Sequence, residues 1–139
     1  MTKDRVLVDT DVISFILKRH PLADLYLPRI GNSECVLSFQ TTAELVRWAL
    51  ARKWGKELRA RLDEFIRACL VIPWSGPLSE KWAEVCEEGR KRGMECEAGD
   101  AWIGATAILY GIPLVSHNRI HYEWMKELGL DLICEAPPV

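Results

Sequence analysis

The sequence lacks both closely spaced cysteines and a long apolar run. Its five cysteines are odd in number, widely separated and outside any C-x-x-C motif: Cys35, Cys69, Cys86, Cys96 and Cys134. This spacing argues against a disulfide framework or a cysteine-ligated zinc site, and it favours reduced, mostly buried thiols. No stretch approaches the roughly 18 apolar residues that a membrane-spanning helix requires, so we expect no membrane contact.

The sequence also lacks an excess of basic charge. The formal net charge is -2, which excludes the global basic footprint of many nucleic-acid-binding proteins, so any such contact must be local. Residues 1–5 lead directly into a strand-like run rather than a signal peptide, and we therefore expect a cytoplasmic protein. With 49% hydrophobic and 27% charged residues, the composition is typical of a globular protein, and residues 1–139 are expected to form a single domain.

Short apolar runs alternate with helical patterns along the whole chain. The runs predict strands over residues 5–9, 35–38, 70–72, 114–116 and 130–134. The segments between them predict helices over residues 12–19, 22–30, 41–53, 56–69, 79–92, 100–110 and 118–128. This alternation is typical of an α/β protein in which helices cover both faces of a parallel sheet, giving three α/β/α layers.

The helix predicted over residues 100–110 is the segment around which the chain is organised. It is apolar almost all round, which is typical of a helix inside the core. Gly111 suits the left-handed position just after a helix, and Pro113 prevents the helix from continuing. Asp100 therefore places a carboxylate at the amino end of a buried helix.

Three acidic residues occupy equivalent ends of predicted elements. Asp9 ends the first strand, Glu44 lies in the first turn of the helix after the second strand, and Asp100 precedes the fourth strand by one helix. If these strands are neighbours, the acids converge beyond the carboxyl ends of the strands. Each like-charged pair at about 5 Å would repel by roughly 3 kcal/mol, which a hard divalent cation such as Mg²⁺ or Mn²⁺ removes.

Each acid also has a simpler interpretation. Asp9 can cap the following helix, and Thr41 with Glu44 has the spacing of a capping box. Asp100 suits the positive end of the helix dipole. The residues alone leave both interpretations open, although three acids at three equivalent positions favour a shared site.

Four segments in order resemble the PIN domain, and most closely the toxins of the VapC type from toxin–antitoxin pairs. They read VDTD (residues 8–11), QTTAEL (40–45), DAWIGATA (100–107) and GIPLVSHN (111–118). The resemblance covers the whole chain. It implies a sheet of four or five parallel strands between two helical layers, and an endoribonuclease that depends on Mg²⁺ or Mn²⁺.

The resemblance also assigns site residues. Asp9, Glu44 and Asp100 would be the catalytic, metal-binding acids, and Ser116 matches a hydroxyl that the family often keeps beside the metal. The family's fourth acid is missing, because Asn118 and His121 stand at the two positions where it commonly occurs. Asn118 and His121 are therefore possible accessory residues, as is Asp11, for which helix capping is the alternative.

Two further patterns were weighed. His117 and His121 have the spacing of a helical zinc pair but lack the intervening glutamate of a zinc hydrolase, which makes that function a minor alternative. A local basic excess includes Arg52, Lys53 and Lys56, which we expect to contact RNA, with Trp48 or Trp54 stacking on a base. The alternatives are a solvated helical face or, from the resemblance, a groove for the antitoxin and part of a homodimer interface.

The sequence thus predicts a metal-dependent endoribonuclease toxin that a cognate antitoxin neutralises. Two other functions stay open. The first is a PIN module with weakened catalysis, since the fourth acid is absent, that acts by binding proteins. The second is a PIN nuclease of RNA processing. The sequence identifies neither the RNA target nor the number of metal ions.

Overall fold

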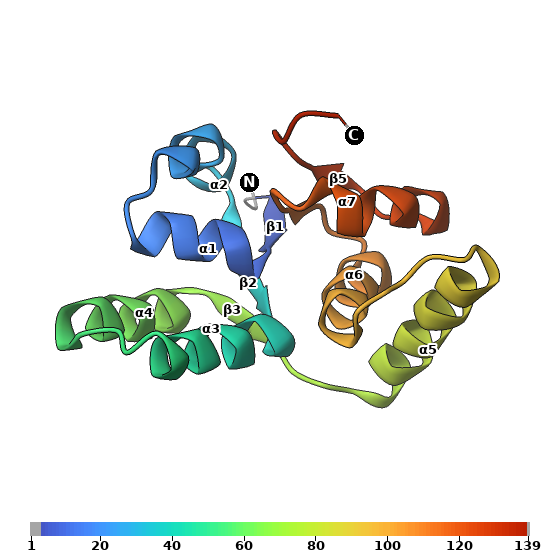
Figure 1. Cartoon of the computed structure of the whole chain (residues 1–139), viewed down its shortest axis with the longest axis horizontal. Coiled ribbons are helices and arrows are strands. Elements are labelled where there is room, and N and C mark those ends of the chain that lie inside the picture. The colour runs from blue at the N-terminus through green and yellow to red at the C-terminus, as the bar shows by residue number, and fades with distance from the viewer. Residues whose placement is uncertain (1–3, 139) are drawn as a thin grey trace.

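The computed structural model describes residues 4–138 and contains a five-stranded parallel sheet (Figure 1). The strand order is β3-β2-β1-β4-β5, and every pairing between neighbours is parallel. The strands are β1 (Arg5–Val8), β2 (Glu34–Ser38), β3 (Leu70–Ile72), β4 (Leu114–Val115) and β5 (Leu132–Ile133). The first, second and fourth strands are neighbours, as the convergence of the three acids requires.

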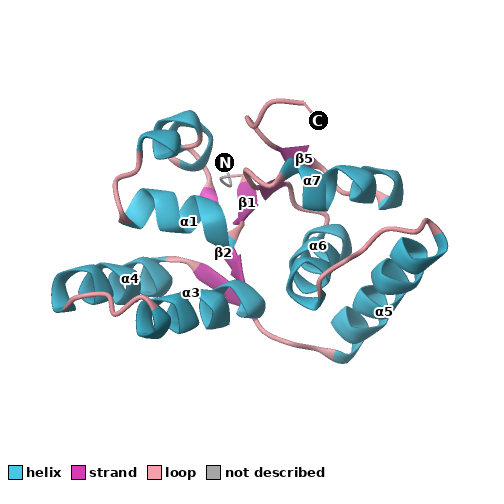
Figure 2. Ribbon diagram, viewed as in Figure 1, coloured by secondary structure: helices cyan, strands magenta, loops and turns pink. Residues whose placement is uncertain are grey.

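Helices cover both faces of the sheet (Figure 2). On one side lie α1 (Thr10–Leu17), α3 (Phe39–Ala51) and α4 (Lys56–Ala68), and on the other α5 (Gly76–Lys91), α6 (Ala98–Tyr110) and α7 (Arg119–Tyr122). The shorter segments are the 3₁₀ helix η1 (Pro21–Leu25), α2 (Leu27–Ile30) and the 3₁₀ helix η2 (Glu123–Leu128). The predicted three-layer α/β/α architecture is therefore confirmed.

Successive residues of the central strand point to opposite faces and enter two separate cores. Leu7 packs with Ala101, Ile103 and other buried residues beneath α5 and α6. Val6 and Val8 pack with Leu45 and other buried residues beneath α1, α3 and α4. This alternation follows from the two-residue period of a strand. A central strand buried on both faces explains why the run near the start of the sequence is continuously apolar.

The expected core helix is confirmed. Within α6, Ala101, Ile103, Ala105 and Ala107 are buried, and the helix ends at Gly111 in the left-handed conformation (φ 65°). Gly104 lies so close to Met125 and Tyr122 of the C-terminal segment that an added Cβ would collide with the Met125 sulfur. The small residue at this position lets the C-terminal segment approach the core helix.

Several predicted boundaries differ from the structure. The helix expected over residues 22–30 is divided into η1 and α2, because Pro28 has no N–H to continue the preceding turn. The helix expected over residues 118–128 is likewise divided into α7 and η2, and Gly129 ends it at φ 100°. The last predicted strand is reduced to Leu132–Ile133.

The five cysteines are free thiols, but each is only partly buried, so the expectation of mostly buried thiols is wrong. Within residues 4–138, no helix has the length and apolar character needed to cross a membrane. The expectation about the start of the chain involves residues 1–3, which lie outside the described range, as does residue 139.

Candidate active site: an acidic pocket

A polar pocket of roughly 300 Å³ lies beyond the carboxyl ends of the central strands and brings the predicted acids together. Its lining includes Asp9, Glu44 and Asp100 from three separate elements. The remaining lining residues are Thr10, Asp11, Arg47, Trp48, Glu97, Asn118 and His121. Five of these side chains carry carboxylates, while Arg47 is the permanent cation of the lining.

Asp9 serves both as a helix cap and as a site residue. It precedes α1 as the N-cap, and its Oδ1 accepts a hydrogen bond from the Thr10 backbone N–H at 2.8 Å. Its Oδ2 accepts from the Ser116 hydroxyl at 2.7 Å. Burial and the charge of Asp11 raise the pKa of Asp9 well above its usual value despite these hydrogen bonds.

Asp100 lies in the first turn of α6 and meets Asp9 at a shared hydroxyl. The buried Tyr122 hydroxyl lies 3.2 Å from Asp100 Oδ1 and 3.4 Å from Asp9 Oδ1. Burial raises the pKa of Asp100, an effect that the neighbouring His121 partly offsets. The two carboxylates therefore share one partly buried environment, in which a nearby cation would stabilise both ionised forms.

Glu44 does not close a capping box, so that interpretation is wrong. The N-cap of α3 is Ser38, whose hydroxyl accepts from the Gln40 N–H, and the helix begins two residues earlier than predicted. Glu44 consequently lies in the second turn, where its side chain accepts from the Thr10 hydroxyl at 2.6 Å and from Gln40 Nε2 at 3.0 Å. The carboxylate faces the pocket rather than its own helix start.

Gly99 brings the amino end of α6 against Glu44. A Cβ at Gly99 would lie 2.7 Å from Glu44 Oε1 and 3.0 Å from Gln40 Nε2. The absence of a side chain at this position thus determines how closely Glu44 approaches the turn that carries Asp100.

The possible accessory residues also reach the site. Asp11 accepts hydrogen bonds from the backbone N–H groups of Val12 at 2.7 Å and of His117 at 3.2 Å, and burial raises its pKa. It is Asp9, and not Asp11, that caps α1. Ser116 links the strand end to the following loop, because its hydroxyl accepts from the Asn118 N–H at 3.0 Å while donating to Asp9.

His121 lies beside Asp100 at the position where the family often has an acid. Its Nδ1 is 2.6 Å from Asp100 Oδ2 and 2.7 Å from Asn118 Nδ2. His121 is therefore placed to orient the Asp100 carboxylate through one ring nitrogen. The other ring nitrogen is left for a second partner.

The two histidines do not form the zinc pair that was weighed from the sequence. His117 precedes α7, and its Nδ1 lies 2.5 Å from the Tyr26 hydroxyl. Its ring packs edge-on against Tyr26 and Phe15. His121 instead faces Asp100. The i, i+4 spacing of a helix does not apply, since α7 begins only at Arg119.

Arg47 and Trp48 line the acidic pocket, whereas the three basic residues predicted to bind RNA do not. Arg52 lies over the Trp48 ring at 4.5 Å from its centroid. Lys53 and Lys56 follow in the turn between α3 and α4 and at the start of α4, where both are exposed. Trp54 is covered by Lys18 at 5.3 Å and packs against the core.

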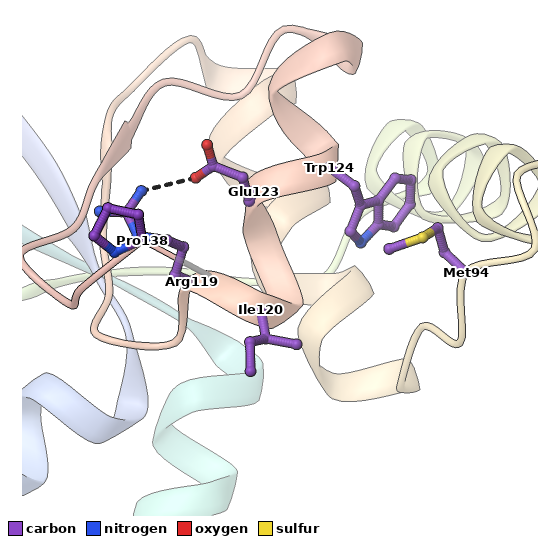
Figure 3. Close-up of a pocket in the computed structure, with 6 residues that line it drawn as sticks. All are labelled: Met94, Arg119, Ile120, Glu123, Trp124 and Pro138. Carbon is purple, nitrogen blue, oxygen red and sulfur yellow. Dashed lines mark hydrogen bonds and ion pairs between the residues drawn. The ribbon is translucent and has the colours of Figure 1, made fainter.

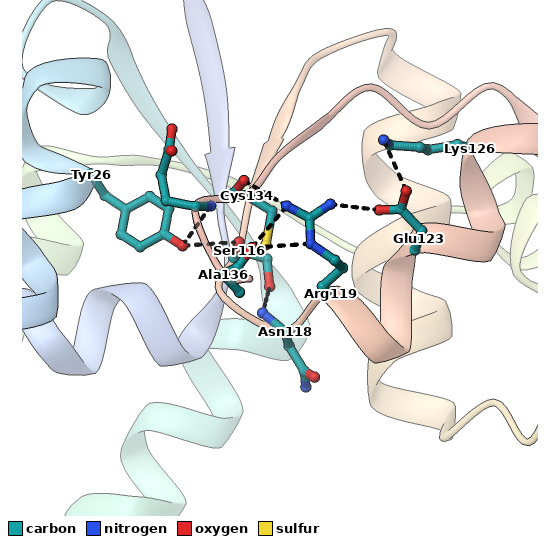
Figure 4. A network of polar contacts seen from close by, with 9 residues as sticks. Tyr26, Ser116, Asn118, Arg119, Glu123, Lys126, Cys134 and Ala136 are labelled. Atoms are coloured by element: carbon teal, nitrogen blue, oxygen red, sulfur yellow. Dashed lines mark hydrogen bonds and ion pairs between the residues drawn. The ribbon is translucent and has the colours of Figure 1, made fainter. Parts of the chain in front are cut away.

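A network of polar contacts supports the loop that carries Ser116, Asn118 and His121 (Figure 4). The Arg119 guanidinium donates to the carbonyl oxygens of Cys134 and Ala136 and forms an ion pair with Glu123. These contacts attach the loop to the C-terminal tail. No sequence motif signalled this role, because it depends on where the tail passes.

A second pocket lies on the other side of α7 (Figure 3). It has a volume of roughly 390 Å³, and its lining combines apolar side chains with one ion pair: Met94, Arg119, Ile120, Glu123, Trp124 and Pro138. The sequence analysis assigned no function to this region. Its polar groups already bond to each other or to the tail, so it offers few free ligand atoms.

The sequence analysis missed three residues that shape the acidic site: Tyr122, Thr10 and Gly99. Tyr122 is separated from Asp9 by most of the chain, so only the fold reveals that its hydroxyl joins two acids. Thr10 adjoins Asp9 in sequence, but its partner Glu44 comes from another helix. The position of Gly99 beside Asp100 was the one available signal.

The donor atoms of the pocket fit a hard divalent cation. They are carboxylate, hydroxyl and amide oxygens, with the imidazole of His121 beside them. Within residues 4–138, no three acidic, imidazole or thiol side chains are arranged to hold a metal ion in the present conformation. Glu44 is directed to Thr10 and Gln40 instead, so metal binding would require rotation of side chains.

The comparisons with known proteins agree with this architecture. The family model described as "PIN domain" matches residues 6–126, and the chain therefore belongs to the PIN domain family. Ribonuclease VapC1 of Methanocaldococcus jannaschii is 28% identical over 134 residues, covering 94% of this chain and 88% of that relative.

Solved toxin–antitoxin complexes have the same fold. The VapBC2 structure from Rickettsia felis, bound to a promoter DNA fragment, superposes with a TM-score of 0.78 at 22% identity. That match covers 94% of this chain and 98% of the other. VapBC-1 from nontypeable Haemophilus influenzae gives a TM-score of 0.77 at 20% identity and covers 94% and 97%.

Proposed function

We propose that this chain is a metal-dependent endoribonuclease and the toxin of a VapBC-type toxin–antitoxin pair. The observation that carries the proposal is the convergence of Asp9, Glu44 and Asp100 in one polar pocket of a PIN fold. The relatives named Ribonuclease VapC and the VapBC complexes among the structural neighbours support the reaction and the partner. The substrate is RNA, and the bond broken is a phosphodiester.

The proposed metal ligands are Asp9, Glu44 and Asp100, with Mg²⁺ or Mn²⁺ as the ion. When bound, the ion would supply positive charge to the scissile phosphodiester and favour ionisation of a water molecule. Rotation of Glu44 away from Thr10 would bring its carboxylate towards the other two acids. Asp11, Asn118 and His121 are accessory candidates, and His121 faces the same carboxylate as the proposed metal.

The chain's own residues organise the acids before any ion binds. Ser116 holds one oxygen of Asp9, and Tyr122 lies between Asp9 and Asp100. Fixing these carboxylates reduces the side-chain entropy that metal binding would otherwise cost. Arg47, exposed at the rim of the pocket, offers a positive charge for an RNA phosphate.

Arg52, Lys53 and Lys56 are proposed to extend this contact beyond the pocket. They lie around the turn from α3 to α4, roughly 12 Å or more from Glu44 along the axis of α3. That distance suits phosphates flanking the cleaved bond rather than the bond itself. The same helical pair is the proposed surface for an antitoxin and for a homodimer contact.

The decisive experiment compares RNA cleavage by the purified chain before and after chelation of divalent ions. We expect cleavage in Mn²⁺ or Mg²⁺, loss of cleavage with chelator, and recovery when the metal is restored. A chain that binds RNA or an antitoxin but cleaves no RNA in either metal would instead be a protein-binding PIN module. Relief of cleavage by the product of a neighbouring antitoxin gene separates a toxin from an RNA-processing nuclease.

A further inference from the structure

Two cysteines lie side by side at the amino ends of β2 and β3. The register pairs Val36 with Leu70, so that Cys35 and Cys69, one residue earlier on each side, are opposite each other. The backbone of Cys69 is extended (φ -100°, ψ 157°) and continues the line of β3. Neighbouring strands are about 4.8 Å apart, which falls inside the range of Cα separations that disulfides span.

The two side chains share one environment. Both thiols pack against the core beneath α1, α3 and α4, and they are hydrogen-bonded to each other. Both also line a surface pocket of roughly 500 Å³ together with Ile30, Phe65 and Ala68. Each cysteine is partly exposed, so a molecule as small as a hydroperoxide can reach the pair.

We infer that Cys35 and Cys69 form a site of reversible oxidation, at which a hydroperoxide converts the two thiols into a disulfide that joins β3 to β2. The strand β3 is short and lies at the edge of the sheet. An edge strand has a partner on one side alone, so it can shift by the fraction of an ångström that S–S bond formation requires.

The chemistry balances in two steps. The Cys69 thiolate attacks the hydroperoxide, the O–O bond breaks, and Cys69 becomes a sulfenic acid as the peroxide is reduced to water or alcohol. The Cys35 sulfur then attacks the Cys69 sulfur, forms the S–S bond and releases water. The hydrogen bond from Cys35 lowers the pKa of Cys69, which favours Cys69 as the attacking thiolate.

The disulfide would stabilise the fold without touching the acidic pocket. The pair lies at the amino ends of the strands, whereas the acids lie at the carboxyl ends. Closing the loop from residue 35 to residue 69 restricts the unfolded chain, and we expect the Tm to rise on the order of 10 °C. The inference does not depend on the proposed nuclease activity.

The test uses the full chain, reduced and then treated with hydrogen peroxide. We expect two of its five cysteines to become protected from alkylation, and peptide mapping without reductant to find one Cys35–Cys69 linkage. Dithiothreitol should reverse both the linkage and the rise in Tm. Cys35→Ser should abolish all three changes, while Cys86→Ser, made at a cysteine in α5, should leave them intact.

Several results would overturn the inference. One is a wild-type map in which oxidation joins any other cysteine pair. Another is Cys69 oxidised to a sulfinic acid with Cys35 still free. Because the map is made on wild-type protein, it decides the question even if Cys35→Ser fails to fold. RNA cleavage plays no part in the readout, so a failure here leaves the proposed function unaffected.

Discussion

Two pockets meet at the short helix α7, and adjacent residues face them. His121 lines the acidic pocket, while Ile120 lines the apolar one with Met94 and Trp124 (Figure 3). The apolar pocket is the larger, at roughly 390 Å³ against 300 Å³. Volume and apolar character therefore favour the wrong pocket as the site of chemistry, and the state of the carboxylates distinguishes the right one.

Carboxylates in the two pockets have opposite surroundings. Glu123 in the apolar pocket is exposed and accepts hydrogen bonds from Lys126 and Arg119, which lower its pKa. Asp9 and Asp100 are held in a buried setting beside other acids, and their pKa values are raised. A satisfied carboxylate is a structural group, whereas clustered acids with raised pKa values indicate a site prepared for a cation.

The largest expected effect comes from removing one charge in the acidic pocket. Asp9→Asn or Asp100→Asn should reduce RNA cleavage by at least about a hundredfold, because each removes a proposed metal ligand. Circular dichroism should show an unchanged fold. Ile120→Ala, on the other side of α7, is the matched control and should cleave at the wild-type rate. Equal activity of Asp100→Asn and Ile120→Ala would contradict the distinction between the pockets.

Glu44 and Gly99 provide a smaller, graded effect. Glu44→Gln removes the charge, and Gly99→Ala places a methyl group where the Glu44 carboxylate now lies. Each change should weaken the metal dependence of cleavage by about tenfold, seen as a higher metal concentration at half-maximal rate. Since Ser38 and not Glu44 caps α3, Glu44→Gln should leave the helix content unchanged. Wild-type metal dependence in both variants would exclude Glu44 as a ligand.

Basic residues should show an effect of a few-fold per contact on RNA binding. Arg47→Gln at the rim should weaken binding and reduce the salt slope by about one for a lost phosphate contact. Neutralising Arg52, Lys53 and Lys56 together should reduce the slope further if all three contact phosphates. Fluorescence titrations of labelled RNA at several salt concentrations measure this slope. A slope unaffected by the triple change would assign those residues to solvent or to the antitoxin.

The smallest effect is on the stability of the metal-free chain. Asp9, Asp11 and Asp100 have folded-state pKa values above the usual 3.8, so the folded chain binds protons more readily than the unfolded chain. Their stabilising contribution is complete below that value and is lost as pH rises through the raised values. With chelator present, we expect the Tm to increase between about pH 7 and about pH 5. Asp100→Asn should reduce this increase, and an unchanged pH dependence would contradict the assignment.

The sequence was sufficient for the fold because its strands and core helix have strong local patterns. The buried strand before Asp9, and the apolar helix ended by Gly111, were predicted from hydrophobic runs and a turn glycine. Boundaries were less certain where several caps compete. Ser38 took the cap that Thr41 was expected to supply, and this single shift of two residues moved Glu44 from the helix start to the pocket.

The predicted acids came from position at strand and helix ends, but their supporting contacts could not be found that way. Tyr122 joins Asp9 and Asp100 across most of the chain, and Arg119 binds carbonyl groups of the tail. Such contacts depend on how the C-terminal segment packs against α6 and leave no periodic trace in the sequence. The basic residues illustrate the converse, since a charge count predicted Arg52, Lys53 and Lys56 while geometry selected Arg47.

Calorimetric titration of Mn²⁺ and Mg²⁺ into the full chain tests the central claim most directly. We expect wild-type protein to bind Mn²⁺ more tightly than Mg²⁺, because the imidazole of His121 stands where a carboxylate is common and Mn²⁺ accepts nitrogen more readily. Asp100→Asn should bind neither ion measurably, and His121→Asp should narrow the difference between the metals. Equal binding by the wild type and Asp100→Asn would show that the acidic pocket is not the metal site.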